Sequence, residues 1–208
     1  FGDSMTSGEI TVPTATALDA NGFPQFKMIL VPADSYPTKL LTLLRSRYTT
    51  QASQFVVTNA GLPREWAADA PRRLPGVLAA TSPQVVLILE GANDLQALGV
   101  TGIEPALLAL QAMVRTARAR GAAVFVASLP PPRPGGANTL SVPQVLTLND
   151  LIRNGASAEG ATFVDLYGAL STNIPLYVGT DGLHPTAAGY QRIADTFFAA
   201  IRTAFEGR

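Results

Sequence analysis

The sequence contains no cysteine and a single histidine among its 208 residues. The absence of cysteine excludes disulfides, thiolate catalysis and cysteine-ligated metal sites. A lone histidine argues against a zinc site, because such sites draw heavily on cysteine and histidine ligands. We therefore expect no metal centre, and any reaction that needs an imidazole must use His184.

Charge is also sparse in this chain. Charged residues make up 14% of the sequence, and the formal net charge at pH 7 is zero. Lys27 and Lys39 are the only lysines and the arginines are scattered, so there is no basic patch for nucleic acid or an anionic membrane. No apolar run approaches the roughly 20 residues that span a bilayer, so we expect no transmembrane segment.

The composition that remains is that of a globular protein. Apolar residues make up 47% of the chain, which favours a packed core over disorder. The length suits one domain over residues 1–208. Because the chain opens at Phe1 and not at methionine, we expect an upstream segment, either a signal peptide or part of a first strand, and the compartment stays open.

Short apolar runs alternate with longer segments of helical period, which predicts an α/β protein with a parallel sheet covered by helices. About five strands are expected, over residues 55–58, 85–89, 123–128 and 161–164, with one more ending at Phe1. Helices are predicted over residues 36–48, 65–80, 104–120 and 142–159 and after Pro185, and loops over residues 8–35 and 130–143.

Polar residues follow three of the predicted strands. They form the segments Gly2-Asp3-Ser4, Asn59-Ala60-Gly61 and Glu90-Gly91-Ala92-Asn93-Asp94. In an open α/β sheet, ligands bind at the carboxyl ends of the strands. The sequence therefore predicts that these three segments converge at one edge of the sheet.

A serine, the histidine and an acid are available for nucleophilic catalysis. A hydroxyl needs an adjacent imidazole to take its proton, and the imidazole needs an acceptor that holds its tautomer. Ser4, His184 and Asp181 are the candidates for these three roles, with Asp165 as the fallback acid. Taken singly, these residues fit helix caps and turns. Their joint occurrence at strand ends, with the only histidine, favours an active site.

The four segments together resemble the GDSL, or SGNH, hydrolase family. Gly2-Asp3-Ser4 is similar to its first block, Asn59-Ala60-Gly61 to its second, Gly91-Ala92-Asn93-Asp94 to its third and Asp181-Gly182-Leu183-His184-Pro185 to its last. The resemblance covers the whole chain in the right order. It implies a flavodoxin-like three-layer α/β/α sandwich and a serine hydrolase that needs no cofactor.

The resemblance also implies residue roles. Ser4 would be the nucleophile, His184 the general base and acid, and Asp181 the orienting carboxylate. The oxyanion hole would consist of the Ser4 and Gly61 backbone N–H groups and the Asn93 amide, which suits the chemistry because preorganised neutral donors stabilise a developing oxyanion. Other polar residues are interpreted as structural or solvated, namely Asp3, Asp94, Arg64, Trp66 and Arg133.

Two features depart from the family pattern. Most of the first strand is absent, and nearly thirty residues separate Ser4 from the helix start at Ser35-Tyr36-Pro37. We expect that insertion to shape the pocket. Our leading hypothesis is an esterase or lipase acting on small-molecule carboxylic esters. The alternatives are a carbohydrate O-acetylesterase with the same residues, an acyltransferase and a non-catalytic binding module.

Overall fold

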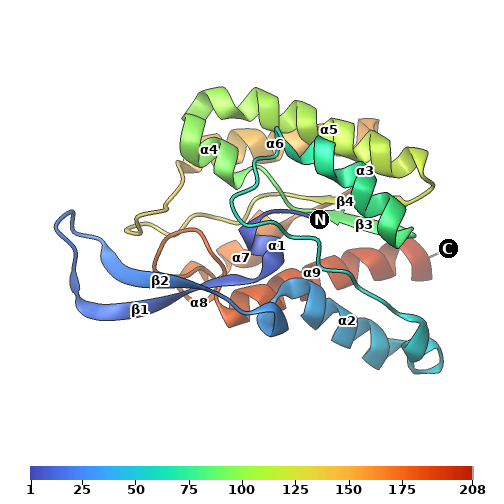
Figure 1. Ribbon diagram of the computed structural model, residues 1–208, viewed down its shortest axis with the longest axis horizontal. Helices are drawn as coiled ribbons and strands as arrows, with labels where there is room; N and C mark the ends of the chain where they lie inside the picture. Colours follow the sequence, from blue (N-terminus) through green and yellow to red (C-terminus); the bar gives the residue numbers. More distant parts are fainter. Residues whose placement is uncertain (208) are drawn as a thin grey trace.

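The computed structural model describes residues 1–207, and three layers are visible in it (Figure 1). The middle layer is a parallel sheet of three strands, β3 (Val85–Ile88), β4 (Ala123–Ala127) and β5 (Thr162–Val164), in the order β3-β4-β5. β4 is buried along nearly its whole length, as expected of an apolar strand covered on both faces. Three of the predicted strands are therefore confirmed, and each is one residue shorter than predicted.

Helices cover both faces of this sheet. On one face lie α3 (Ala70–Thr81), α4 (Ala92–Leu98), α5 (Ile103–Ala119) and α6 (Val142–Ala158). On the other lie α2 (Tyr36–Arg47), α7 (Leu166–Ser171), α8 (Ile174–Tyr177) and α9 (Ala187–Glu206). Short 3-10 turns, Pro32–Asp34, Thr49–Gln54 and Gly99–Gly102, join some of these elements.

The predicted helices agree with α2, α5, α6 and α9 to within one or two residues at each end. The prediction for residues 65–80 was wrong at its start, because α3 begins at Ala70 with Pro71 in its first turn. Proline suits a first turn, where its missing N–H has no intrahelical acceptor. The short helices α4, α7 and α8 were not predicted.

The stretch Ala92–Ala119 is long and apolar enough to cross a membrane by length and composition, with a mean hydropathy of 1.5. In the structure it is divided between α4, a 3-10 turn and α5. Ala106, Leu110, Met113 and Ala117 of α5 are buried at helical spacing in the core. We therefore interpret this stretch as the core helix of the domain.

The predicted strand over residues 55–58 was wrong, and the five-strand count is not reached in the described residues. Residues 55–60 have no regular secondary structure. A strand needs a backbone ladder, and on this side of β3 the described residues pair only through Phe1 and Gly2, with Gly2 forming parallel bridges with Leu89 and Gly61. Phe1 lies in the position expected for a strand end, since its carbonyl accepts from the Leu89 N–H at 3.2 Å.

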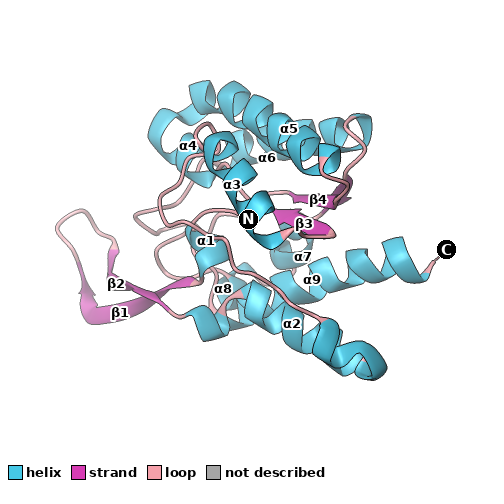
Figure 2. Ribbon diagram, turned by 45° about the vertical axis from the view of Figure 1, so that its right-hand side comes forward, coloured by secondary structure: helices cyan, strands magenta, loops and turns pink. Residues whose placement is uncertain are grey.

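The predicted loop over residues 8–35 was also wrong, because most of it forms an antiparallel hairpin of β1 (Glu9–Leu18) and β2 (Pro24–Leu30). The hairpin projects from one end of the helical body (Figure 2). Its turn is held by Asp19, whose Oδ1 accepts from the N–H groups of Asn21 and Phe23 at 2.8 and 2.9 Å. The Asn21-Gly22 pair, which follows a segment rich in threonine and precedes the apolar residues of β2, was the missed hairpin signal.

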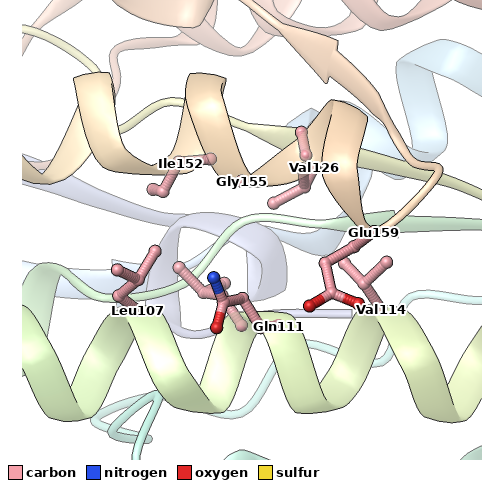
Figure 3. A pocket seen from close by; sticks show the side chains of 9 residues that line it. Leu107, Gln111, Val114, Val126, Ile152, Gly155 and Glu159 are labelled. Carbon is pink, nitrogen blue, oxygen red and sulfur yellow. The ribbon is translucent and has the colours of Figure 1, made fainter.

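The loop predicted over residues 130–143 is confirmed up to α6, which begins at Val142. Residues of α5, α6 and β4 line a small cavity of about 10 Å³ (Figure 3). Leu107, Val114, Val126 and Ile152 line this cavity, with Gln111 and Glu159 beside them. It has room for about one water molecule and is a packing defect.

Candidate active site

Ser4 lies where the chain leaves the sheet. Gly2 pairs with Leu89 at the end of β3, and the short helix α1 (Ser4–Ser7) begins two residues later. Asp3 caps this helix, since its Oδ1 accepts from the Met5 N–H at 2.8 Å. The Ser4 side chain therefore sits at the carboxyl end of the sheet, and only 5% of the residue is exposed.

The structure brings Ser4, His184 and Asp181 together, although the serine and the histidine are 180 residues apart. Ser4 Oγ lies 2.9 Å from His184 Nε2, and His184 Nδ1 lies 2.6 Å from Asp181 Oδ2. Because a carboxylate can only accept hydrogen bonds, Nδ1 carries the hydrogen and donates a hydrogen bond to Asp181. Nε2 is then the acceptor for the Ser4 hydroxyl.

Asp181 is held as a charged carboxylate. It is fully buried and accepts from the N–H groups of Leu183 and His184 at 3.3 and 3.2 Å, from the His184 ring, and from the Asn138 side-chain amide at 3.1 Å. Burial alone raises the pKa of Asp181, but the hydrogen bonds from His184, Asn138 and Leu183 outweigh burial and leave its pKa below the ordinary value. The carboxylate can therefore hold and stabilise the imidazole.

The three predicted oxyanion donors differ in whether their N–H groups already have a hydrogen-bond partner. Ser4 is the first residue of α1, and its backbone N–H has no hydrogen-bond partner in the described part of the chain. The Asn93 amide donates through Nδ2 to the Glu65 carbonyl at 2.8 Å, which leaves its second hydrogen free. The Gly61 N–H, by contrast, donates to Asn59 Oδ1 at 3.0 Å.

Gly61 has a packing reason to be glycine. A Cβ built on it would lie 2.2 Å from the Ser7 nitrogen and 2.7 Å from the Thr6 carbonyl carbon. The segment after Asn59 is thus pressed against α1, and only a residue without a side chain fits there. Three residues on, Arg64 has a positive φ of 65° in the turn closed by the Glu65 N–H and the Leu62 carbonyl at 3.1 Å.

The other polar residues that the sequence drew attention to have structural partners. Asp94 accepts from the N–H groups of Ala67 and Ala68 at 2.7 and 3.2 Å. Asp165 caps α7 through Gly168 at 2.9 Å, and its other oxygen lies 3.7 Å from Arg153. The Arg133 guanidinium donates to the Val178 carbonyl at 3.0 Å. Trp66 is half-buried, in the turn before α3. Asp165 is therefore not the partner of His184.

A cluster of buried acids lies behind Ser4. Asp3, Glu90 and Asp94 are fully buried, and Glu65 is paired with the Arg73 guanidinium, with Nε to Oε1 at 2.7 Å. Burial raises the pKa of Asp3 to about 7, and burial together with the neighbouring Asp3 raises the pKa of Glu90 well above its ordinary value. Asp3 Oδ2 and both Glu90 carboxyl oxygens have no hydrogen-bond partner in the described residues. Glu90 is thus held neutral near Ser4, whereas Asp3, with a pKa of about 7, loses its proton near neutral pH.

Two residues beside the site were missed by sequence reasoning. Asn138 lies in a proline-rich loop 43 residues before its partner Asp181. Glu9 lies in β1, with its carboxylate Oε2 at 3.7 Å from His184 Nε2. Neither residue belongs to a recognisable motif, and no local signal in the sequence points to either contact.

Comparison with known proteins identifies the family of the chain. The model of the GDSL-like Lipase/Acylhydrolase family matches residues 1–192. Esterase TesA of Pseudomonas aeruginosa is 26% identical over 166 residues, which cover 78% of this chain and 77% of that protein. The fold and the family match define an α/β hydrolytic enzyme, and the chain belongs to the GDSL-like lipase/acylhydrolase family. It is a carboxylic ester hydrolase.

Solved structures share the fold. A lipase/acylhydrolase from Enterococcus faecalis has a TM-score of 0.73 at 21% identity, over 98% of this chain and 94% of that one. A mutant of Axe2, an acetyl-xylooligosaccharide esterase from Geobacillus Stearmophilus, has a TM-score of 0.69 at 19% identity, over 96% of this chain and 91% of the other. At this identity the likeness concerns the fold alone.

Proposed function

We propose that the protein cleaves acyl esters through an acyl-enzyme formed on Ser4. The observation that carries the proposal is the hydrogen-bonded chain from Ser4 Oγ through His184 to Asp181, at 2.9 and 2.6 Å. Both distances lie in hydrogen-bond range. His184 can therefore take the proton of the serine, and the carboxylate can orient the imidazole. Asp181 is the orienting carboxylate because the other candidate, Asp165, caps α7 elsewhere.

In this mechanism Ser4 Oγ attacks the ester carbonyl while its proton moves to His184 Nε2. The carbonyl oxygen becomes an oxyanion, and the tetrahedral intermediate collapses as Nε2 returns the proton to the departing alcohol oxygen. A water molecule then gives its proton to Nε2 and attacks the acyl-enzyme. The acid leaves, and Ser4 recovers its proton.

The Ser4 N–H and the free hydrogen of the Asn93 amide stabilise the oxyanion in this mechanism. Each such donor typically contributes about 3 kcal/mol to lowering the barrier. Gly61 was the third expected donor, but its N–H is already taken by Asn59 Oδ1 at 3.0 Å. Arg64 offers a backbone N–H without a partner in the described residues, in the turn that precedes Glu65. We assign the third donor position to this turn.

A carbohydrate O-acetylesterase is the second candidate. The fold likeness to an acetyl-xylooligosaccharide esterase favours it. The shortage of aromatic residues, 7% of the chain with one tryptophan, argues against it, because sugar sites usually stack on aromatic side chains. An optimum at longer acyl chains in the assay below would argue against this candidate, whereas an optimum at acetate would keep it and call for acetylated sugars as the next substrates.

The test is hydrolysis of p-nitrophenyl esters from acetate to palmitate by the wild-type protein and Ser4→Ala. We expect turnover that depends on Ser4, with a chain-length optimum that reports whether an acetyl group or a longer acyl chain is accepted. A fluorophosphonate probe should label the wild type and not the variant. Absence of both labelling and turnover would contradict the proposal and favour a non-catalytic binding module.

A further inference from the structure

Glu9 lies next to the atom that delivers the proton to the leaving alcohol. Its carboxylate Oε2 is 3.7 Å from His184 Nε2, while Ser4 Oγ is 2.9 Å from the same nitrogen. In ester cleavage the departing oxygen must come within about 3 Å of that nitrogen. The departing oxygen therefore lies within roughly 7 Å of the Glu9 carboxylate, so the next few atoms of the alcohol can reach it.

The backbone of Glu9 is fixed by contacts on three sides. Tyr190 is fully buried in α9 and donates its hydroxyl to the Glu9 carbonyl at 2.6 Å. Glu9 pairs with Leu30 in the hairpin ladder, and the Val31 N–H donates to the Gly8 carbonyl at 2.9 Å. This root of the hairpin is thus a rigid wall of the site, while the hairpin tip projects away from it (Figure 1).

The same wall adjoins the loop that carries Asp181 and His184. A Cβ built on Gly179 would lie 2.3 Å from Thr11 Oγ1 and 3.1 Å from the His184 carbonyl oxygen. β1 thus packs closely against that loop, which fixes the Glu9 backbone relative to His184.

Apart from His184, the Glu9 carboxylate has no charged partner in the described residues. In residues 1–207 no lysine or arginine lies within salt-bridge distance of it, and no hydrogen-bond donor is bound to either of its oxygens. Its side chain is about one-fifth exposed. A partly desolvated carboxylate gains most from a positively charged or hydrogen-donating group placed against it.

We propose that Glu9 selects the alcohol part of the substrate. It favours esters whose alcohol carries a positive charge or a hydroxyl within a few atoms of the ester oxygen, and disfavours alkyl alcohols, which would cover the carboxylate without satisfying it. The inference rests on the proposed function, because it takes His184 as the group that protonates the alcohol. It concerns the alcohol side only and says nothing of the acyl chain.

The test uses two pairs of acetate esters matched in shape. Acetylcholine is compared with 3,3-dimethylbutyl acetate, which differs in charge, and 2-hydroxyethyl acetate with propyl acetate, which differs in a hydroxyl. For the wild type we expect kcat/KM to favour the polar member of at least one pair by roughly tenfold. The pair that shows the preference tells whether charge or hydrogen bonding is recognised.

The Glu9→Gln variant keeps the shape and the hydrogen-bond acceptor but loses the charge, and Glu9→Leu loses both. A charge preference should collapse in Glu9→Gln, and a hydroxyl preference should collapse in Glu9→Leu. Glu104→Gln is the matched control, because Glu104 is exposed in the first turn of α5. We expect it to change neither ratio.

Three outcomes would overturn the inference. They are a wild type without preference in either pair, ratios that survive both Glu9 variants, and an equal loss on all four esters, which would mean that Glu9 acts on His184 and not on the substrate. Hydrolysis of p-nitrophenyl acetate by wild type but not Ser4→Ala is measured alongside. If that control succeeds, the proposed function stands whatever the ratios show.

Discussion

Two kinds of buried carboxylate lie near Ser4, and their pKa values are shifted in opposite directions. Asp181 is buried but accepts four kinds of donor, from Leu183, Asn138 and both the backbone and the ring of His184, and its pKa is lowered. Glu90 is equally buried but has no donor on either oxygen in the described residues, and its pKa is raised well above the ordinary value. Burial alone therefore does not decide the charge of an acid here; the number of donors does.

The two kinds of carboxylate have different roles in the proposed mechanism. In the proposed mechanism, a charged Asp181 stabilises the imidazolium that forms when Ser4 gives up its proton. Glu90, whose raised pKa keeps it neutral, adds no negative charge beside the position where the proposed oxyanion would develop. Asp3 shows both behaviours in one side chain, since Oδ1 accepts from Met5 at 2.8 Å whereas Oδ2 has no partner in the described residues.

The largest effect should come from removing the charge of the well-satisfied acid. In Asp181→Asn the amide no longer favours the tautomer that leaves Nε2 free to accept from Ser4, so we expect kcat/KM to fall by about 10⁴-fold without unfolding. The matched control is Asp165→Asn, which keeps its cap on α7 and should stay within about twofold of wild type. Equal losses in the two variants would refute the assignment.

The next effect concerns stability and pH. The pKa of Asp3 is about 7 in the folded protein against 3.8 ordinarily. Between these values the folded state holds a proton that the unfolded state has released, so the free energy of unfolding should fall as pH rises from about 4 to 7, by up to roughly 4 kcal/mol. Asp3→Asn keeps the Oδ1 cap and should remove this part of the slope.

Urea unfolding at pH 4, 5, 6, 7 and 8 measures this slope for the wild type, Asp3→Asn and the exposed-site control Glu104→Gln. Glu90 contributes with the same sign as Asp3, because its folded pKa is also raised, so some slope should remain in Asp3→Asn. Identical slopes in Asp3→Asn and the wild type would show that Asp3 is charged in the fold.

The smallest effect should come from taking one donor away from Asp181. Asn138→Ala removes the Nδ2 contact at 3.1 Å and leaves the other three. A hydrogen bond to a charged group contributes about 1.5 kcal/mol, so we expect kcat to fall by roughly tenfold. Gln96→Ala, which removes only the group that donates to Asn138 Oδ1 at 3.1 Å, should cost less. A larger loss in Gln96→Ala than in Asn138→Ala would contradict the role of Asn138.

Much of the fold could be predicted from local pattern. The helices α2, α5, α6 and α9 have a clear apolar stripe and recognisable ends, so their bounds agree to within one or two residues. The segment over residues 55–58 shows the limit of this reasoning. It is apolar enough for a strand, but a strand exists only where a neighbouring backbone pairs with it.

For the site, the sequence pointed to Ser4, His184 and Asp181 through residue type and scarcity, since the chain has only one histidine. It failed at Gly61, where the glycine fits the close approach to Ser7 and its N–H bonds Asn59. It also missed the hairpin, although the Asn21-Gly22 turn carried a local signal.

The sequence by itself therefore determined the chemical class, much of the alternation of strands and helices, and the serine and histidine proposed for catalysis. Only the tertiary structure decided which acid faces His184, that Asn138 supports it, and that Glu9 stands beside Nε2. It also decided that the pKa of Asp181 is lowered while the pKa of Asp3 is raised to about 7. The physical reason is that residue type and periodicity are local properties, whereas distance, burial and the supply of donors depend on segments far apart in the chain.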